Sequence, residues 1–319
     1  MRGGRDALRA LQVPGDRTRE QIRKVIKLKT SRKFLLLILI PIFIEALVFL
    51  IIPILGTLGI SFLNYNPLNH SADFVGLDNY RELLDDPDAV KAFKNTIVFT
   101  VVAVALNIVI SLAVATLISQ MKSNKTRSFF RMIVFLPCMA PMVASAVVWG
   151  RSIFNTKIGL VNQIIEAFGG EGVAWTGDPH YVMFSVIVFT LWADLGYNII
   201  LYSAGIDGIP GEVYEAAELD HAGGWNKFFH ITLPLLGRTT TFVVLMTLIS
   251  YFQMFAQFSV LLFKDGPQNS GLVLTSYIYE NAFIYKEMGY AAALSVVLFL
   301  LILIVSLVQQ RINKVDWEY

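Results

Sequence analysis

The chain has 319 residues, of which 55% are hydrophobic and 16% are charged, and its mean hydropathy is +0.59. Soluble domains are roughly 45–50% apolar and about 25% charged, so this composition excludes an ordinary water-soluble globule. The 26 Lys and Arg residues nearly balance the 24 Asp and Glu residues, so any charge asymmetry has to be local. A single cysteine, Cys138, excludes an intramolecular disulfide and a thiolate metal cluster.

Six apolar stretches are long enough to cross a hydrocarbon core of about 30 Å, which requires roughly 20 helical residues. Each is apolar around its whole circumference, and a helix satisfies its own backbone hydrogen bonds in lipid. The sequence therefore predicts an all-α polytopic membrane protein with six transmembrane helices. The first stretch lacks a following small-residue cleavage pattern, which indicates a retained span rather than a signal peptide. The predicted spans are Phe34–Phe62, Phe93–Ile118, Phe129–Trp149, Val182–Ala204, Pro234–Phe263 and Met288–Val308.

These spans divide the chain into a basic tail at residues 1–33, a transmembrane domain at 34–310 and a short tail at 311–319. Lys and Arg near span ends favour the cytoplasmic side. Placing both termini in the cytoplasm puts 19 of the 26 Lys and Arg residues there, and we predict that orientation. Residues 17–33 form either an interfacial amphipathic helix attracted to anionic lipid or a disordered basic orientation signal.

Three connections are predicted to be external. The first, Asn64–Ala92, carries six acidic residues, and we expect a short helix in it near Asn79–Leu84. The other two, Arg151–Tyr181 and Lys264–Glu287, contain glycine- and proline-rich turn signals.

The fourth span contains a carboxylate, Asp194. Charged side chains within spans are costly and usually face a cavity. Tyr197 and Asn198 follow within one helical turn, so the cluster offers acceptor, donor and aromatic surface to a polyol. We therefore expect Asp194, Tyr197 and Asn198 to line a substrate path.

The connection Gly205–Pro234 is unlike an ordinary polar loop. Pro210 and Gly211 open one predicted short helix, Ala222–Gly224 form a turn, and a second amphipathic helix begins near Trp225. Such a pair of helices suits a groove on a soluble partner. The alternative is a surface helix pair that only braces the spans.

The fifth span is unusually polar at its centre. At 100° per residue, one helical arc carries polar and aromatic side chains that suit the hydroxyls and C–H faces of a sugar. These side chains either line a pore or join neighbouring helices by hydrogen bonds. The residues of the arc are Thr247, Ser250, Tyr251, Met254 and Phe258, with Gln253 and Gln257 at its edge.

Sequence patterns of catalysis are absent. The chain has no G-x-x-x-x-G-K-[ST] loop, so ATP-driven work requires another subunit. It has no H-E-x-x-H, C-x-x-C or G-x-S-x-G pattern, and its four histidines are not at ligand spacing. We therefore predict a chain that is not an enzyme and holds no metal or cofactor.

The residues around Glu215 resemble a known signature. Glu215-Ala216-Ala217, a turn residue four positions later, nine residues, and then Ile231-x-Leu233-Pro234 match the EAA signature of binding-protein-dependent ABC importer permeases. The chain departs from it at His221, where the signature has glycine. Histidine tolerates a left-handed conformation better than most residues, and Gly223 and Gly224 lie beside it.

The resemblance covers nearly the whole chain beyond the basic tail. It narrows to the carbohydrate-uptake group, which includes the maltose and glycerol-phosphate transporter permeases, and it implies the type I importer permease fold. The residues that carry it are Phe74–Tyr80, Arg131, Phe135–Pro137, Trp149, Gly159–Asn162, Trp192, Gly196–Tyr197, Ile209–Pro210 and Gly289–Ala291.

This resemblance implies a sugar-translocating subunit in a prokaryotic cytoplasmic (inner) membrane. Its expected partners are a second, homologous permease, two ATPase subunits that carry ATP and Mg, an extracytoplasmic solute-binding protein and membrane lipid, with no nucleic acid. By the same resemblance, Glu45 lies in a peripheral first helix, where we expect an interhelical or interfacial role. The residues expected to seat a coupling helix in an ATPase groove are Glu215, Ala216, Ala217, Asp220, His221, Gly223 and Gly224. Those expected along the substrate path are Asp194, Tyr197, Asn198, Thr247, Ser250, Tyr251, Gln253, Met254 and Gln257.

Three other functions stay open. The first is a permease of the same superfamily for a non-sugar solute, such as glycerol phosphate or a peptide. The second is an autonomous channel or secondary transporter, which would move solute without ATPase subunits. A membrane-bound enzyme is a distant third, because the sequence shows no catalytic cluster.

Overall fold

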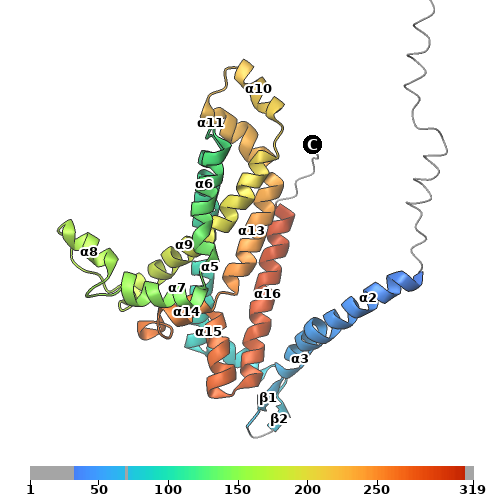
Figure 1. The fold of residues 1–319 in the computed structure, drawn as a ribbon. Helices are drawn as coiled ribbons and strands as arrows, with labels where there is room; N and C mark the ends of the chain where they lie inside the picture. The colour runs from blue at the N-terminus through green and yellow to red at the C-terminus, as the bar shows by residue number, and fades with distance from the viewer. Residues whose placement is uncertain (1–31, 69–70, 313–319) are drawn as a thin grey trace, which may run out of the picture. The chain divides into compact units, whose positions relative to one another are not determined.

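The computed structural model describes residues 32–68 and 71–312 and divides into two units, residues 1–56 and 57–319. The described part of the first unit is helical (Figure 1): α2 (Arg32–Ala46) is followed by the π-helical turn η2 (Leu47–Ile51) and by α3 (Ile52–Ile60), whose last four residues belong to the second unit. The stretch Leu36–Ile60 has 25 residues and a mean hydropathy of 2.9, sufficient to cross a membrane. The predicted first span is therefore present. The basic tail, with its proposed amphipathic helix, lies almost entirely outside the described residues.

A small hairpin precedes the bundle of the second unit. Strands β1 (Leu63–Asn66) and β2 (Ser71–Phe74) pair antiparallel, where the sequence predicted only a loop. The expected short helix follows as α4 (Asp78–Asp85). The buried Asn79 amide donates hydrogen bonds to the backbone carbonyls of Ser61 (2.8 Å) and Leu63 (3.0 Å), which fixes α4 against the hairpin.

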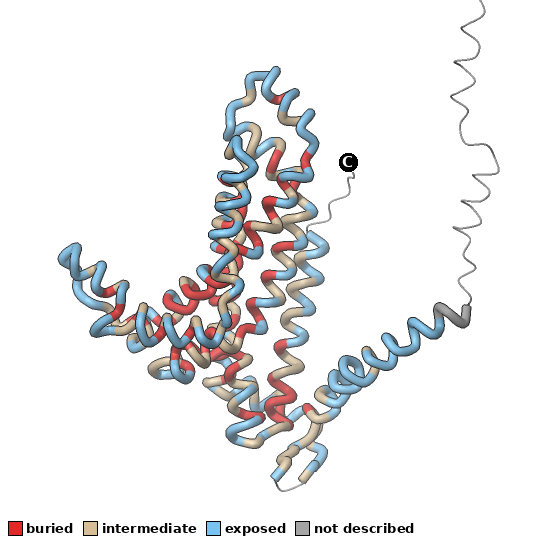
Figure 2. Tube along the Cα trace, in the orientation of Figure 1, coloured by how far each residue is buried: buried red, intermediate tan, exposed pale blue. Residues whose placement is uncertain are grey.

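Three long helices confirm the second, fourth and sixth predicted spans. They are α5 (Pro87–Ser119), α9 (Pro179–Asp207) and α16 (Met288–Ile312). Buried residues concentrate along α5, along α9 and at the start of α16, which is the end predicted to face the outside of the cell (Figure 2). Helix α9 lies very close to α6 at Gly196. Glycine is needed there, because a Cβ atom at this position would collide with the backbone carbonyl of Val134. Gly289 at the start of α16 allows a similar approach to Leu63 of β1.

The third predicted span is not one helix. Helix α6 (Asn124–Phe135) and the 3-10 turn η3 (Leu136–Met139) meet α7 (Met142–Val148) and the π-helical turn η4 (Trp149–Ile153) at an angle of 88°. Ala140 is extended because Pro141 follows it, and Pro141 cannot donate a helical hydrogen bond. The prediction of a continuous helix over residues 129–149 was wrong.

The fifth predicted span is also broken. One bend of 68° separates the helical run Gly224–Leu235 from α13 (Gly237–Phe252), and a second break separates α13 from α14 (Ala256–Leu261). At the second break, Thr275 donates a hydrogen bond to the backbone carbonyl of Met254. That carbonyl has no helical partner, so a side chain from a distant helix satisfies it. The prediction of a continuous span over residues 234–263 was therefore wrong.

The remaining elements are short. They are α8 (Leu160–Ala167), α10 (Gly211–Leu219), α11 (Gly224–Lys227), η5 (Phe228–Thr232), α12 (Leu233–Leu235), η6 (Pro267–Asn269), α15 (Leu274–Tyr279) and η7 (Glu280–Tyr285). The described residues thus contain four uninterrupted helices able to span a membrane, or six spans if each bent pair counts as one.

Asp86 joins three helices at the start of α5. Its Oδ1 accepts the backbone N–H of Asp88 (2.9 Å), and its Oδ2 accepts the hydroxyls of Tyr277 in α15 (2.5 Å) and Tyr290 in α16 (2.7 Å). Burial alone raises the pKa of Asp86, but the bonds from Tyr277, Tyr290 and the backbone at Asp88 and Ala89 outweigh it and hold the pKa below 3.8. The carboxylate is therefore the form that the fold stabilises.

We expect Asp86→Ala to lower the free energy of unfolding by about 1–3 kcal/mol, because a helix cap and a charged acceptor are lost. A pKa below its unfolded value means that this stabilisation is fully present above about pH 4 and is lost as the pH falls further. Thermal unfolding of the full chain in detergent should show the same Tm decrease at pH 5 and pH 7. Asp85→Ala, at the exposed neighbour, is the control. A Tm decrease that disappears between pH 7 and pH 5 would contradict the assignment.

Candidate functional site

The segment between α9 and α13 forms two short helices joined by a turn, as predicted. Helix α10 protrudes at one end of the bundle, opposite the end that carries α15 (Figure 1). In the turn, His221 donates its backbone N–H to Glu218 (3.0 Å) and Ala222 donates to Ala217 (2.9 Å). This pair of bonds is the Schellman motif, which requires a left-handed residue at position 221. His221 has φ 53°, so it adopts the conformation that glycine provides in the signature.

The outer surface of this segment is apolar as well as acidic. Leu219, Trp225 and Phe229 are 82%, 77% and 52% exposed, and the rings of Trp225 and Phe229 stack 5.9 Å apart. Large exposed apolar side chains that lie close together, as Trp225 and Phe229 do, typically mark an interaction surface. We refer to Leu219, Trp225 and Phe229 as the apolar knob.

The structure separates the residues that the sequence grouped for coupling. Ala217 is buried, so it belongs to the packed side of its helix and not to the outer surface. The other six are exposed; they are Glu215, Ala216, Asp220, His221, Gly223 and Gly224. The sequence signal for the apolar knob was the four-residue spacing of Trp225 and Phe229, which places them on one helical face.

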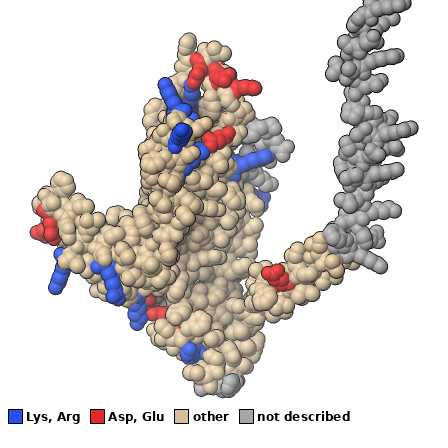
Figure 3. Space-filling model, viewed as in Figure 1, with Lys and Arg blue, Asp and Glu red and all other residues tan. Residues whose placement is uncertain are grey.

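Polar contacts join the short helices of this segment to one another on the side that borders a cavity. Tyr214 and Thr232 share a hydrogen bond of 3.0 Å, and Lys227 forms an ion pair of 2.9 Å with Glu218. These side chains help to line a cavity of about 960 Å³ between the segment and the ends of α5, α6 and α9. Charged side chains gather at this end of the protein (Figure 3).

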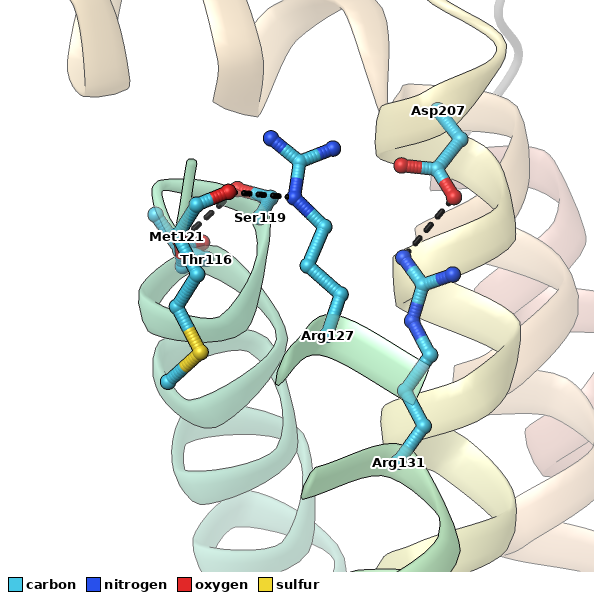
Figure 4. A network of polar contacts seen from close by, with 6 residues as sticks. All are labelled: Thr116, Ser119, Met121, Arg127, Arg131 and Asp207. Atoms are coloured by element: carbon cyan, nitrogen blue, oxygen red, sulfur yellow. Dashed lines mark hydrogen bonds and ion pairs between the residues drawn. The ribbon is translucent and has the colours of Figure 1, made fainter. Parts of the chain in front are cut away.

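Two arginines of α6 join the ends of the long helices beside this segment. Arg131 forms an ion pair of 2.8 Å with Asp207 at the end of α9, and Arg127 donates to the backbone carbonyl of Met121 after α5 (2.7 Å) (Figure 4). These contacts hold α5, α6 and α9 together at the end of the bundle from which the segment emerges, while the bonds of Tyr214 and Lys227 hold the short helices to one another.

A second candidate site lies between α9 and α13. Two cavities of about 230 and 510 Å³ share Asp194 and Ser250 in their walls. Together they are lined by all nine residues predicted for the substrate path. The smaller one is lined by Asp194, Tyr197, Asn198, Met246, Thr247, Ser250 and Tyr251, and the larger one by Met142, Asp194, Ser250, Gln253, Met254, Phe255, Ala256 and Gln257.

The helical arc expected for the fifth span does not exist in that form. Because α13 ends at Phe252, Gln253 and Met254 lie in the break and Gln257 lies on α14. The break still leaves all three at the larger cavity. Phe258 is fully buried and packs edge-on against Phe99 with ring centres 4.8 Å apart, so its placement on the arc was wrong.

A buried hydrogen-bonded network borders the smaller cavity. Asn107 of α5 donates to the hydroxyl of Tyr251 (2.7 Å), and Asn198 of α9 donates to Asn107 (2.7 Å) and to Thr247 of α13 (2.9 Å). The sequence analysis missed Asn107, although an amide near the middle of an apolar span was a visible signal. For Thr247 and Tyr251 the structure thus shows the helix-joining contacts that were the alternative to pore lining, and Asn198 makes contacts of the same kind.

Other polar groups of the cavities have no such partner. Among the described residues, no hydrogen bond or ion pair reaches the side chain of Asp194, Tyr197, Ser250, Gln253 or Gln257. A polar group in a membrane span that is not paired within the protein is available to water or to a solute.

One protein family and several known proteins are similar to this chain in sequence. Residues 107–314 match the family described as binding-protein-dependent transport system inner membrane component. The probable ABC transporter permease protein YurN of Bacillus subtilis (strain 168) is 35% identical over 280 residues, which cover 86% of this chain and 95% of YurN. The arabinooligosaccharides transport system permease protein AraP of the same strain is 33% identical over 273 residues, 86% of each chain.

The fold is similar to that of a chain in the crystal structure of a bacterial alginate ABC transporter in complex with an alginate pentasaccharide-bound periplasmic protein. The TM-score is 0.79, and the match covers 90% of this chain and 96% of that chain at 23% identity. The type I importer permease fold expected from the sequence is confirmed.

We expect Asn107→Leu to lower the free energy of unfolding by about 1–3 kcal/mol, because Tyr251 loses its donor and Asn198 loses an acceptor in a buried setting. Thermal unfolding in detergent measures it. Ser111→Ala is the matched control: Ser111 is equally buried on α5, but its hydroxyl bonds only to its own helix. Equal Tm losses in the two variants would contradict the role given to the network.

Proposed function

This chain belongs to the family of binding-protein-dependent transport system inner membrane components, and from that membership we propose that it translocates a sugar or oligosaccharide as the permease subunit of an ABC importer. The arabinooligosaccharide permease AraP, similar over most of both chains, supports a sugar as the solute. The unpaired polar side chains of the cavities carry this proposal: hydroxyl, amide, carboxylate and aromatic groups are the surfaces that bind a polyhydroxylated ring.

The cavities form this chain's part of the path. Asp194, Ser250, Gln253 and Gln257 contact the solute, while Asn198 and Thr247 hold the helices that present them. Tyr251 does both, because its hydroxyl accepts from Asn107 and retains its own proton to donate. A surface of several weak hydrogen bonds suits a transport site, which must release its solute as well as bind it.

The braced segment transmits force from ATP hydrolysis. The apolar knob and Glu215 enter a groove on an ATPase subunit, in the helix-in-groove mode. The Lys227–Glu218 ion pair and the Tyr214–Thr232 bond hold the short helices together, and the Arg131–Asp207 ion pair joins α6 to the end of α9, from which the chain continues into α10. A motion of the ATPase subunits therefore reaches the helices that line the cavities.

The other parts of the assembly follow from the family. A second, homologous permease completes the path, two ATPase subunits hold ATP and Mg, and a solute-binding protein delivers the sugar. The chain itself binds no cofactor and performs no catalysis. Both termini and α10 lie in the cytoplasm, so the hairpin and α15 face the binding protein.

Affinity purification of the tagged chain, followed by sugar screening of the solute-binding protein that co-purifies, tests the assignment. We expect a complex that contains two ATPase subunits and a binding protein specific for a sugar. Solute uptake by the chain alone in liposomes would support an autonomous channel and overturn the proposal, and a binding protein specific for peptides or glycerol phosphate would overturn the solute class.

Glu215→Lys should uncouple ATP hydrolysis from transport. The exposed carboxylate is expected to pair with a basic group on the ATPase, and charge reversal replaces that attraction with repulsion. In proteoliposomes of the complete transporter we expect uptake to fall at least tenfold while ATP hydrolysis persists. Glu212→Lys, the same reversal one turn earlier on α10, is the control. Unchanged uptake in Glu215→Lys would contradict this role.

Gln257→Ala and Gln253→Ala should reduce uptake severalfold more than they reduce assembly, because both side chains line the larger cavity and neither is hydrogen-bonded within the described residues. The measurements are uptake per transporter and the yield of the purified complex. Gln163→Ala, on the exposed face of α8, should change neither. Parallel losses of yield and uptake would indicate that these side chains only join helices.

A further inference from the structure

The charge of the cavities has a consequence for the solute. Among the described residues that line them, Asp194 is the only charged side chain, and it belongs to both cavities. No Lys, Arg or His contributes to either wall, and none of the ion pairs among the described residues includes Asp194.

The surroundings of Asp194 are those of a low-dielectric site. It lies on α9, which is the most buried of the long helices, and the rest of the lining is neutral. A carboxylate in such a place gains from hydroxyl donors, because each can replace a lost hydrogen bond to water. A sugar presents many of them.

A negatively charged solute, in contrast, is repelled by the Asp194 carboxylate. Two like charges roughly 4 Å apart at an effective dielectric constant of about 20 repel by an amount that corresponds to about a thousandfold in affinity. The described cavity walls offer no cation to compensate.

We propose that Asp194 selects the solute by charge, so that this permease passes neutral, hydroxyl-rich sugars and rejects sugars that carry carboxylate or phosphate groups. The proposal rests on the proposed function, since it takes the two cavities as part of the translocation path. It adds a specificity determinant and a substrate class to that path.

The test uses the complete transporter in proteoliposomes and two sets of probes. One set contains neutral gluco-, galacto- and arabino-oligosaccharides, and the other contains hexuronate oligosaccharides of the same lengths. To separate the permease from its delivery protein, affinity is also measured by thermal shift of the complex without the solute-binding protein. We expect the hexuronates to bind and enter at least 100-fold more weakly than the best neutral sugar.

Asp194→Asn removes the charge and keeps the shape. It should reduce the preference for neutral sugars at least tenfold, chiefly by improved hexuronate binding. Asp178→Asn is the matched control, because Asp178 caps the same helix 16 residues earlier, about 24 Å away at 1.5 Å per residue, and lines neither cavity. It should leave the ratio unchanged.

Two outcomes overturn the proposal directly: a hexuronate affinity within tenfold of that of the best neutral sugar in the unaltered transporter, or an unchanged affinity ratio in Asp194→Asn. Asp194→Glu keeps the charge and serves if Asp194→Asn does not assemble. Loss of the preference for neutral sugars in Asp194→Glu would also overturn the proposal. Binding and import of no sugar of either set is a different result, because it removes the proposed function itself.

Discussion

The structure depends on one constraint: in a hydrocarbon environment, every backbone polar group must be satisfied within the protein. The long helices α5, α9 and α16 meet it by themselves. Where a predicted span breaks, a specific partner is present. Thr275 supplies a donor to the freed carbonyl of Met254 after α13 ends. At Pro141, the break falls at a residue that has no N–H to satisfy.

The same constraint sorts the polar side chains of the interior into two groups. Asn107, Asn198, Thr247 and Tyr251 bond to one another and so join α5, α9 and α13. Asp194, Ser250, Gln253 and Gln257 also line the cavities, but they are left without partners among the described residues. The first group holds the helices of the path in fixed positions, and the second group supplies the polar side chains that can hydrogen-bond to the solute.

The coupling segment, Gly205–Pro234, also has one side that is fixed within the protein and one side that is free to bind a partner. Its inner side is fixed by Ala217, by the Tyr214–Thr232 bond and by the Lys227–Glu218 ion pair. Its outer side exposes Glu215 and the apolar knob. The Schellman turn at His221 sets the angle between the two short helices, so a residue other than glycine performs the same conformational role at this position.

The sequence alone determined the helical class, four of the spans, the two-helix coupling segment and the family, because hydrophobic length and local turn chemistry are properties of neighbouring residues. It also identified every polar residue that lines the two cavities between α9 and α13 in the described part of the chain. The third span breaks at Pro141, a local signal that the prediction of a continuous helix did not take into account. Tertiary structure decided where the fifth span breaks, that Ala217 and Phe258 face inward, and that Asn107 completes the polar network. These outcomes depend on partners such as Thr275 and Phe99, which are distant in sequence and which no local pattern specifies.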